Sequence, residues 1–398
     1  MKLKPLGKLT LLILVLGLAF GGYKLWSQMR GGTADGTTVA VNNNSGASSG
    51  DAGAIDNRPA TEPVASNEIQ IISSNTKKGW LADQINAFNA KQGDGVKVVA
   101  KAVETREAMT GILNGQYKPA LWSPSSVIWA DRLSEVWQDK TRQSLLDTGD
   151  VNSYRQIFKS PIVFLTTKEK ARFLRPLLEN DAWGNIRKIS DGKIRVPYGK
   201  FKWAHADPLN ANSGMLTMAL ILSDYAGKNG KGGAINQVAK SPEFATYLSQ
   251  LEKDFVYDEA VKNGSSALVK SFVADPSRYD FVTAYESAAL DQVIKNPDLV
   301  VIYPSPTVNS EQAIAALDWP DLSDDQRKAA HDFLQFLASK SSVEAGFKEY
   351  FRPSRGDNPA ISRYKSAGFQ SSYNAIEVPP YLALNDAGYQ WSKVIGKG

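Results

Sequence analysis

The chain alternates between short apolar runs and longer segments whose apolar residues recur every three or four positions. From residue 68 onward, the runs "EIQIISS", "VKVVAKAV" and "PALW" are each followed by an amphipathic segment. In the first such segment, Leu81, Ile85 and Phe88 fall on one face of a helix. The segments "REAMTGILNG" and "SPSSVIWADRLSEVW" are the next two predicted helices. This βαβαβα order predicts an α/β fold whose mostly parallel sheet is covered on both faces.

The second half of the chain continues the pattern. The runs "PIVFLTT", "KIRVPYGK" and "LVVIYPS" are typical of strands, and "YDFVTAYESAALDQVI" passes from strand to helix. Met215 to Tyr225 is apolar almost all the way round, which predicts a buried helix. "SDDQRKAAHDFLQFLAS" predicts a helix with Ser323 as its N-cap. At 398 residues the chain is long for one core, so two lobes are expected.

The N-terminus has the pattern of an export segment. Lys2, Lys4 and Lys8 precede an apolar stretch, Leu9–Trp26, whose 18 residues reach the lower limit for crossing a membrane. A cleaved signal peptide and an uncleaved signal anchor both fit residues 1–30, and we favour the anchor. Residues 31–66 are rich in Gly, Ser, Thr, Asn and Ala, which predicts a disordered linker. Either alternative puts the remainder outside the cytoplasm, on the periplasmic or extracellular face of the membrane.

Composition narrows the function classes. The formal net charge of +5 equals the five Lys and Arg of residues 1–30, so the rest of the chain is balanced and no nucleic-acid partner is expected. The absence of Cys excludes disulfides and thiol catalysis, and two His argue against a His-rich metal site or a His-based triad. We find no glycine fingerprint for a nucleotide and no GxSxG elbow. The sequence therefore favours capture over catalysis, with no catalytic residue, metal or cofactor expected.

Small polar residues gather where strands are expected to end. The segments are "SSNTKKG", "ETRE", "WSPSS" and "NANSG". Ligands of open α/β sheets bind beyond the carboxyl ends of the strands, where helix N-termini offer free N–H groups. Each loop alone is more often a helix cap than a binding site, and Lys77 and Lys78 are expected to be solvated. The helix termini favour an oxyanion, whereas Glu104, Glu286 and Tyr285 leave a cation or a polyol open.

Several segments in the same order resemble one family. "IISSNTKKGWLADQINAFNA", "ILNGQYKPALWSPSSVIW", "SPIVFLTTKEKA", "HADPLNANSGMLTMAL" and "VTAYESAAL" resemble the bacterial extracellular solute-binding proteins of ABC transporters, which have the type 2 periplasmic binding fold. The resemblance covers about residues 68–354. It implies two α/β lobes joined by two hinge crossover strands and closing on a solute. On this basis residues 67–160 are assigned to lobe 1, 161–286 to lobe 2, and 287–398 to the second part of lobe 1 and a C-terminal tail.

The resemblance also implies the ligand contacts. They would be Ser73, Ser74, Asn75 and Thr76 in the first loop, Ser123 in the third, Asn212 and Ser213 in lobe 2, and Tyr285 at the hinge. Gly214 would allow close backbone approach behind Ser213. Where many relatives have small residues, this chain has Glu104 and its two neighbours.

Three functions follow from this pattern. The first is capture of a small polar solute for transport, with a membrane permease as partner. The second is a membrane-tethered interaction or sensory protein of the cell envelope that reuses the fold. The third, and least supported, is an extracytoplasmic hydrolase.

Overall fold

The computed structural model describes residues 65–396, and the first part of this range follows the predicted strand–helix alternation. The elements are β1 (Glu68–Ser73), the short 3-10 helix η2 (Asn75–Lys77), α2 (Lys78–Asn89), β2 (Lys97–Ala102), α3 (Thr105–Leu113), β3 (Leu121–Ser123) and α4 (Val127–Thr141). β1 lies between β2 and β3 and is parallel to both. Apolar residues of α2 pack on one face of this sheet, and those of α3 and α4 pack on the other. We call this sheet and its helices the first lobe.

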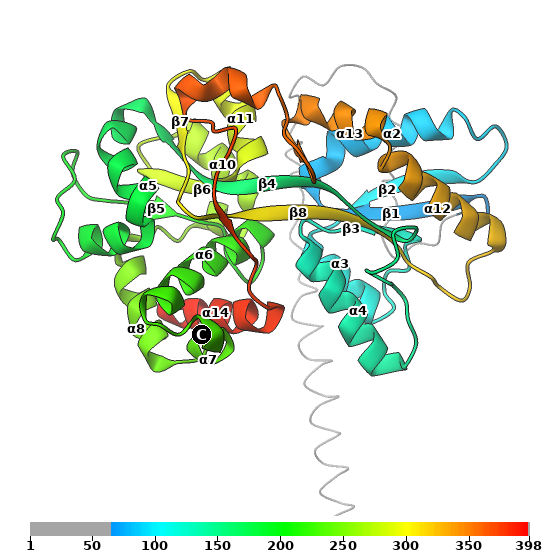
Figure 1. Cartoon of the computed structure of the whole chain (residues 1–398), viewed down its shortest axis with the longest axis horizontal. Helices are drawn as coiled ribbons and strands as arrows, with labels where there is room; N and C mark the ends of the chain where they lie inside the picture. Colours follow the sequence, from blue (N-terminus) through cyan, green and yellow to red (C-terminus); the bar gives the residue numbers. More distant parts are fainter. Residues whose placement is uncertain (1–64, 397–398) are drawn as a thin grey trace, which may run out of the picture. The chain divides into compact units, whose positions relative to one another are not determined.

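Two long antiparallel strands, β4 (Tyr154–Thr167) and β8 (Thr307–Ala316), connect the first lobe to a second sheet. The first part of β4 pairs with β8, while its last residues pair with β6 (Phe281–Tyr285) and β7 (Leu299–Ile302). At the other end, β8 pairs with β3 of the first lobe. Figure 1 shows β4 and β8 side by side between the two sheets. They are the crossover strands of a two-lobed α/β fold.

The second lobe is built around β4, β5, β6 and β7. Its other elements are α5 (Lys168–Ser190), β5 (Trp203–Ala204), α6 (Asn212–Lys228), α7 (Ile235–Val238), α8 (Pro242–Leu251), α9 (Glu259–Lys262), α10 (Ser265–Ala274) and α11 (Glu286–Lys295). Apolar residues of α5, α6 and α8 cover one face of the sheet, and those of α10 and α11 cover the other. The expected strand at "KIRVPYGK" is wrong, because residues 193–200 have no regular structure. Pro197 lacks the N–H of a ladder bond, and Gly199 has a positive φ.

The chain stays with the second lobe beyond residue 287. β7 pairs with β4 inside the second sheet, and the 3-10 helix η6 (Ile361–Ala367) packs against β7. The expectation that lobe 1 resumes at residue 287 is therefore wrong, and the return begins on β8. Leu299–Ile302 is an apolar run that either sheet could bury, so its sequence alone does not select a lobe.

The remaining elements divide between the lobes. They are α12 (Asp324–Leu337), α13 (Lys340–Ala345), β9 (Arg352–Pro353), β10 (Ala375–Ile376) and α14 (Tyr381–Val394). α12 packs on β1 and α2 of the first lobe, and Ser323 caps it in a capping box, as predicted. α14 instead lies beside α6, α7 and α8 of the second lobe (Figure 1). The expected assignment of residues 287–398 to lobe 1 is thus also wrong for this helix.

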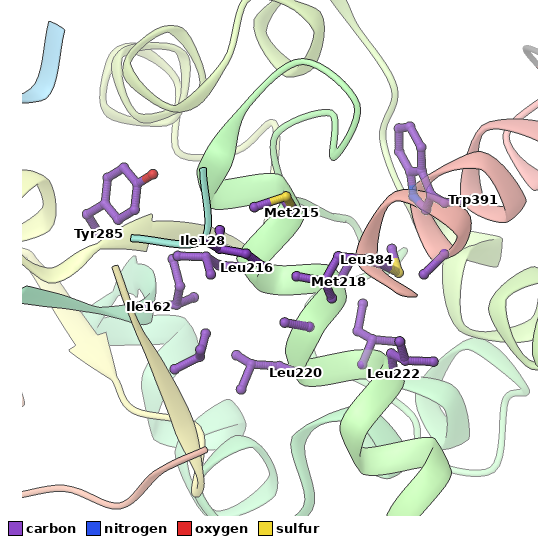
Figure 2. Packing of buried hydrophobic residues seen from close by; sticks show 14 of the residues in the cluster. Ile128, Ile162, Met215, Leu216, Met218, Leu220, Leu222, Tyr285, Leu384 and Trp391 are labelled. Carbon is purple, nitrogen blue, oxygen red and sulfur yellow. The ribbon is translucent and has the colours of Figure 1, made fainter. Parts of the chain in front are cut away.

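The apolar helix α6 is buried on nearly all sides, as predicted. Met218, Leu220 and Leu222 are at most 2% exposed and lie in the largest core cluster. Figure 2 shows α6 with the sheet on one side, near Ile162, and α14 on the other, near Leu384. A helix enclosed in this way needs no polar face, which explains its composition.

A buried ion pair connects β9 with α11. Arg352 of β9 donates from Nε and Nη2 to the two carboxylate oxygens of Glu286, each over 2.7 Å. Both side chains are at most 1% exposed. Tyr303 also donates its hydroxyl to Glu286, which adds a partner for the carboxylate. The ion pair therefore connects α11 of the second lobe to β9, which follows α12 and α13 in the chain.

The expected N-terminal anchor (residues 1–30) lies outside the described residues, as does the linker (residues 31–66) except for its last two residues. Within residues 65–396, no helix combines the length and the apolarity needed to cross a membrane.

Candidate functional site

The first predicted loop follows β1 at the carboxyl end of the first sheet. The hydroxyl groups of Ser74 and Thr76 are 2.9 Å apart, and Asn75 donates from Nδ2 to Glu104 Oε1 over 3.3 Å. Ser73 is buried and donates its hydroxyl to the carbonyl of Ser74. The loop thus lies against the N-terminus of α3, where Glu104 is the N-cap residue.

The third loop, residues 123–126, brings hydroxyl groups to the same place. Ser123 is fully buried and donates its hydroxyl to the carbonyl of Ala313 over 2.9 Å, so this hydroxyl is used inside the sheet. Ser125 Oγ lies 3.0 Å from Thr105 Oγ1 of α3. Ser126 is also fully buried, and its Oγ has no hydrogen-bond partner within residues 65–396. A buried hydroxyl without a partner is costly, which makes Ser126 the better candidate for a ligand contact.

The second lobe contributes the N-terminus of α6. Asn212 donates from Nδ2 to the hydroxyl of Tyr285 over 3.0 Å, and its Oδ1 accepts from Trp129 Nε1 over 2.7 Å. The hydroxyl of Ser213 contacts that of Ser265, the first residue of α10. Trp129 belongs to the first lobe, so Asn212 connects the two lobes directly.

The backbone at Gly214 lies close to the preceding segment of the chain. A Cβ at this position would overlap with the carbonyl oxygen of Ala206. Only Gly lets the start of α6 pack this closely against the preceding backbone.

Tyr285 ends β6 at the centre of this polar group. Its side chain is 3% exposed, and burial is the main reason that its pKa is raised above the usual value, so it remains a protonated phenol. Its hydroxyl interacts with Asn212, and also with Ser310 of β8 and Ser265 of α10. The charge of Glu104 raises the pKa further. We call this set of side chains the interlobe polar cluster (Ser74, Asn75, Glu104, Thr105, Ser125, Ser126, Asn212, Ser213, Ser265, Tyr285 and Ser310).

Several helices that begin at the interlobe polar cluster have no side-chain cap. α3, α4, α6 and α10 have no N-cap side chain that accepts a hydrogen bond from their first turn. Among the other helices, the N-cap side chains of α5, α8, α9, α12 and α13 each accept one, whereas those of α2, α7, α11 and α14 do not. Four helices thus present uncapped N–H groups, and the partial positive charge of their dipoles, at one place.

Two titratable groups set the charge of the site. Lys77 was expected to be solvated, but it is 1% exposed and donates from Nζ to the carbonyl of Pro124 over 3.2 Å. Burial lowers the pKa of Lys77 to about 7. Partial desolvation also raises the pKa of Glu104, whose side chain remains exposed to solvent, and the hydrogen bond from Asn75 partly offsets this shift. Both groups are therefore easier to neutralise than in water.

A groove of about 580 Å³ leads to Glu104 from outside. It lies between α3 on one side, with Arg106 and Tyr117, and the residues around Gly264 on the other. Within residues 65–396, no group of three or more His, Asp or Glu side chains is arranged to hold a metal ion.

Four serines of the interlobe polar cluster were not predicted as ligand contacts from the sequence. Ser265 and Ser310 lie far along the chain from the loops they join, and nothing in their local sequence marks them. Ser125 and Ser126 lie in the "SPSS" loop, which was predicted to face the ligand. The contact expected from this loop, however, was Ser123. The missing cap of α6 was a usable signal, since Ala211 at its N-cap has no side chain that can accept a hydrogen bond.

The fold is shared with solved solute-binding proteins at low sequence identity. The sulfate-binding protein SubI from Mycobacterium tuberculosis is 18% identical with a TM-score of 0.54, and the match covers 83% of this chain and 99% of that one. The ferric binding protein from Campylobacter jejuni is 12% identical with a TM-score of 0.58, covering 82% and 99%. A Trichodesmium protein (IdiA, FutA) solved with iron and citrate is 13% identical with a TM-score of 0.53, covering 82% and 99%.

The family follows from the sequence itself. No curated protein matches the chain. The model of the bacterial extracellular solute-binding proteins, however, matches residues 69–350, which is well over half of the chain. This span contains most of both lobes, both crossover strands and every residue of the interlobe polar cluster. The chain therefore belongs to the family of bacterial extracellular solute-binding proteins.

Proposed function

We propose that the interlobe polar cluster captures a small oxyanion outside the cytoplasm and that the protein passes it to a membrane permease. The observation that carries this proposal is the meeting of several uncapped helix N-termini at one polar cluster. α3, α4, α6 and α10 all begin there without a side-chain cap. Uncapped helix N-termini bind anions through their N–H groups and dipoles.

The charges of the site favour the same class of ligand. Lys77 is buried next to the first loop, burial lowers its pKa, and it forms no ion pair within residues 65–396. An anion would supply the missing partner. Glu104 opposes an anion when ionised, but its raised pKa makes protonation easier, and a protonated carboxyl group donates a hydrogen bond.

The same proposal includes a membrane anchor. Residues 1–30 would hold the protein at the membrane, and residues 31–66 would act as a flexible tether. A coil of this length and composition spans roughly 30–35 Å on average, enough to keep the binding lobes near a permease. An intact N-terminus on the mature protein, measured by mass spectrometry, would support the anchor over a cleaved signal.

The first experiment identifies the ligand. The full-length chain is screened by thermal shift against sulfate, phosphate and molybdate, with a divalent cation and a polyol as the competing classes. A ligand at 100 times its dissociation constant should stabilise the protein by about 2.7 kcal/mol. Stabilisation by the cation or the polyol, with none by any oxyanion, would contradict the proposed ligand class.

The second experiment tests the site with a matched pair of variants. Ser126→Ala removes a buried hydroxyl without a partner, so it should leave stability unchanged or slightly higher. If that hydroxyl contacts an anion, affinity should fall roughly 10- to 150-fold. The control is Ser241→Ala, because Ser241 caps α8 away from the site.

The control variant should behave in the opposite way. It should lose about 1 kcal/mol of stability and keep its affinity. If Ser126→Ala instead lowers stability and leaves affinity intact, Ser126 is only part of the scaffold and the interlobe polar cluster is not the binding site.

A further inference from the structure

The C-terminal helix α14 is fixed to the second lobe. Trp391, near its end, is fully buried, with ring centroids 5.4 Å from His205, 5.7 Å from Phe255 and 6.1 Å from Tyr257. In Figure 2, Leu384 of α14 lies near Met218 of α6, and Trp391 lies farther along α14. The aromatic contacts hold the second half of the helix in one place on the second lobe.

The first turn of α14 reaches the first lobe. The ring of Tyr381 packs edge-on against Trp129 of α4, with centroids 5.3 Å apart. Two cations of the first lobe also face this ring, since the guanidinium carbons of Arg106 and Arg132 lie 5.9 and 5.3 Å from its centroid. Arg106 donates from Nη1 to Tyr381 Oη over 3.3 Å and to Asn385 Oδ1 over 3.2 Å. One helix therefore contacts both lobes.

These contacts continue into the binding site. Trp129, which packs on Tyr381 and lies under the guanidinium of Arg106, donates its indole N–H to Asn212 Oδ1 over 2.7 Å. This bond orients the Asn212 amide so that its Nδ2 faces Tyr285. The position of α14 is thus linked to a polar side chain of the interlobe polar cluster through a single indole ring.

We propose that α14 is a latch that holds the two lobes together, and that Tyr381 and Arg106 are positioning residues which orient Asn212 through Trp129. The role in solute capture rests on the proposed function, but the latch itself does not. α14 lies beyond residues 69–350, the span that the family model matches. The latch biases the lobes toward contact before a solute arrives, and apparent affinity rises with the fraction of molecules already competent to bind.

The test measures the distance between the lobes in the full-length chain without solute. The chain has no Cys, so Asp139→Cys in the first lobe and Lys200→Cys in the second give two specific sites for fluorescent dyes. Both positions are exposed. Single-molecule energy transfer in nanodiscs then reports the distribution of interlobe distances.

Three variants separate the latch from the rest of the helix. Tyr381→Ala removes the ring that faces the first lobe, and Arg106→Gln removes the main partner from the other side. Tyr389→Ala is the matched control, since Tyr389 is on the same helix but 53% exposed. We expect the first two variants to shift the distribution toward longer distances, and the control to match the unmodified chain. Because Tyr381 and Arg106 contact each other and both contact Trp129, the shift in the double variant should be smaller than the sum of the two single shifts.

A second readout concerns binding. With inorganic phosphate and sulfate as probes, Tyr381→Ala and Arg106→Gln should weaken whichever anion binds by about 3- to 30-fold. If neither anion binds the unmodified chain, the proposed function fails while the distance measurement still tests the latch. Identical distance distributions for Tyr381→Ala, Arg106→Gln and Tyr389→Ala would overturn the latch, whatever the binding results.

Discussion

Replacing Lys77 with Met should change how the stability of the protein depends on pH. Lys77 is 1% exposed, its Nζ donates to the carbonyl of Pro124, and burial lowers its pKa from 10.5 to about 7. A buried ammonium without a counter-charge is costly, and Met has a similar length without the charge. The variant therefore removes both the cost of burying the charge and the hydrogen bond.

The size of the effect follows from the pKa difference. Between pH 7 and 10.5 the unfolded chain carries a proton on Lys77 that the folded protein does not. Stability therefore rises with pH in this window, by about 1.4 kcal/mol per pH unit from this group. The penalty is fully present below pH 7, at about 5 kcal/mol, and falls to about 1 kcal/mol at pH 10. The lost hydrogen bond to Pro124 costs Lys77→Met about 1–3 kcal/mol at every pH.

The assay is urea denaturation of both proteins from pH 6.5 to 10 without added anion. The difference in unfolding free energy should favour Lys77→Met most at the lowest pH and shrink as the pH rises. Lys78→Met is the control, because Lys78 is the exposed neighbour on the same turn. The unfolding free energy of Lys78→Met should stay within about 0.5 kcal/mol of that of the unmodified chain at all pH values.

The pH dependence of the difference in unfolding free energy is a better test than its absolute value. The lost hydrogen bond contributes the same amount at every pH, so it does not affect the slope. A difference between Lys77→Met and the unmodified chain that does not vary with pH would mean that Lys77 keeps its charge in the folded state. Added anion supplies a second check. A bound anion favours the protonated amine, so the pH dependence should become smaller at saturating anion in the unmodified chain only.

Two further substitutions test the packing around the site by urea denaturation. Gly214→Ala should destabilise the protein by about 1–3 kcal/mol, because the new Cβ meets the Ala206 carbonyl, whereas Gly227→Ala on the same helix has open space and should stabilise it by about 0.5–1 kcal/mol. Equal effects at the two positions would contradict the close approach. Arg352→Ala should cost about 3–5 kcal/mol, since it leaves the Glu286 carboxylate buried without its cation; a loss under 1 kcal/mol would mean that the carboxylate is protonated or solvated.

The sequence carried enough information for the fold class and for the first lobe. The alternation of strands and helices from residue 68 to residue 141 depends on local periodicity and on turn residues, which each segment contains by itself. The buried helix α6 and the cap at Ser323 were predicted for the same reason. The N-terminal anchor and the linker remain predictions, because almost all of their residues lie outside the described range 65–396. The ligand contacts remain predictions because they depend on a ligand.

The errors occur where two surfaces compete for the same segment. Leu299–Ile302 and α14 each have an apolar face that either lobe could bury, and they pack on the second lobe because of the path of β4 and α6. Lys77 and Lys78 are adjacent and identical in type, yet one is buried and the other exposed. No local pattern distinguishes them.

For this protein, the sequence alone determined which segments become strands and helices, and which loops end in small polar residues. Only the tertiary structure decided that four uncapped helix N-termini meet at one place, that Ser126 and not Ser123 has a free hydroxyl, and that α14 contacts both lobes. The physical reason is the distance along the chain over which each kind of interaction acts. Periodicity, caps and turns act over a few residues, whereas burial and charge in the site depend on groups up to about two hundred residues apart, such as Ser123 and Ala313.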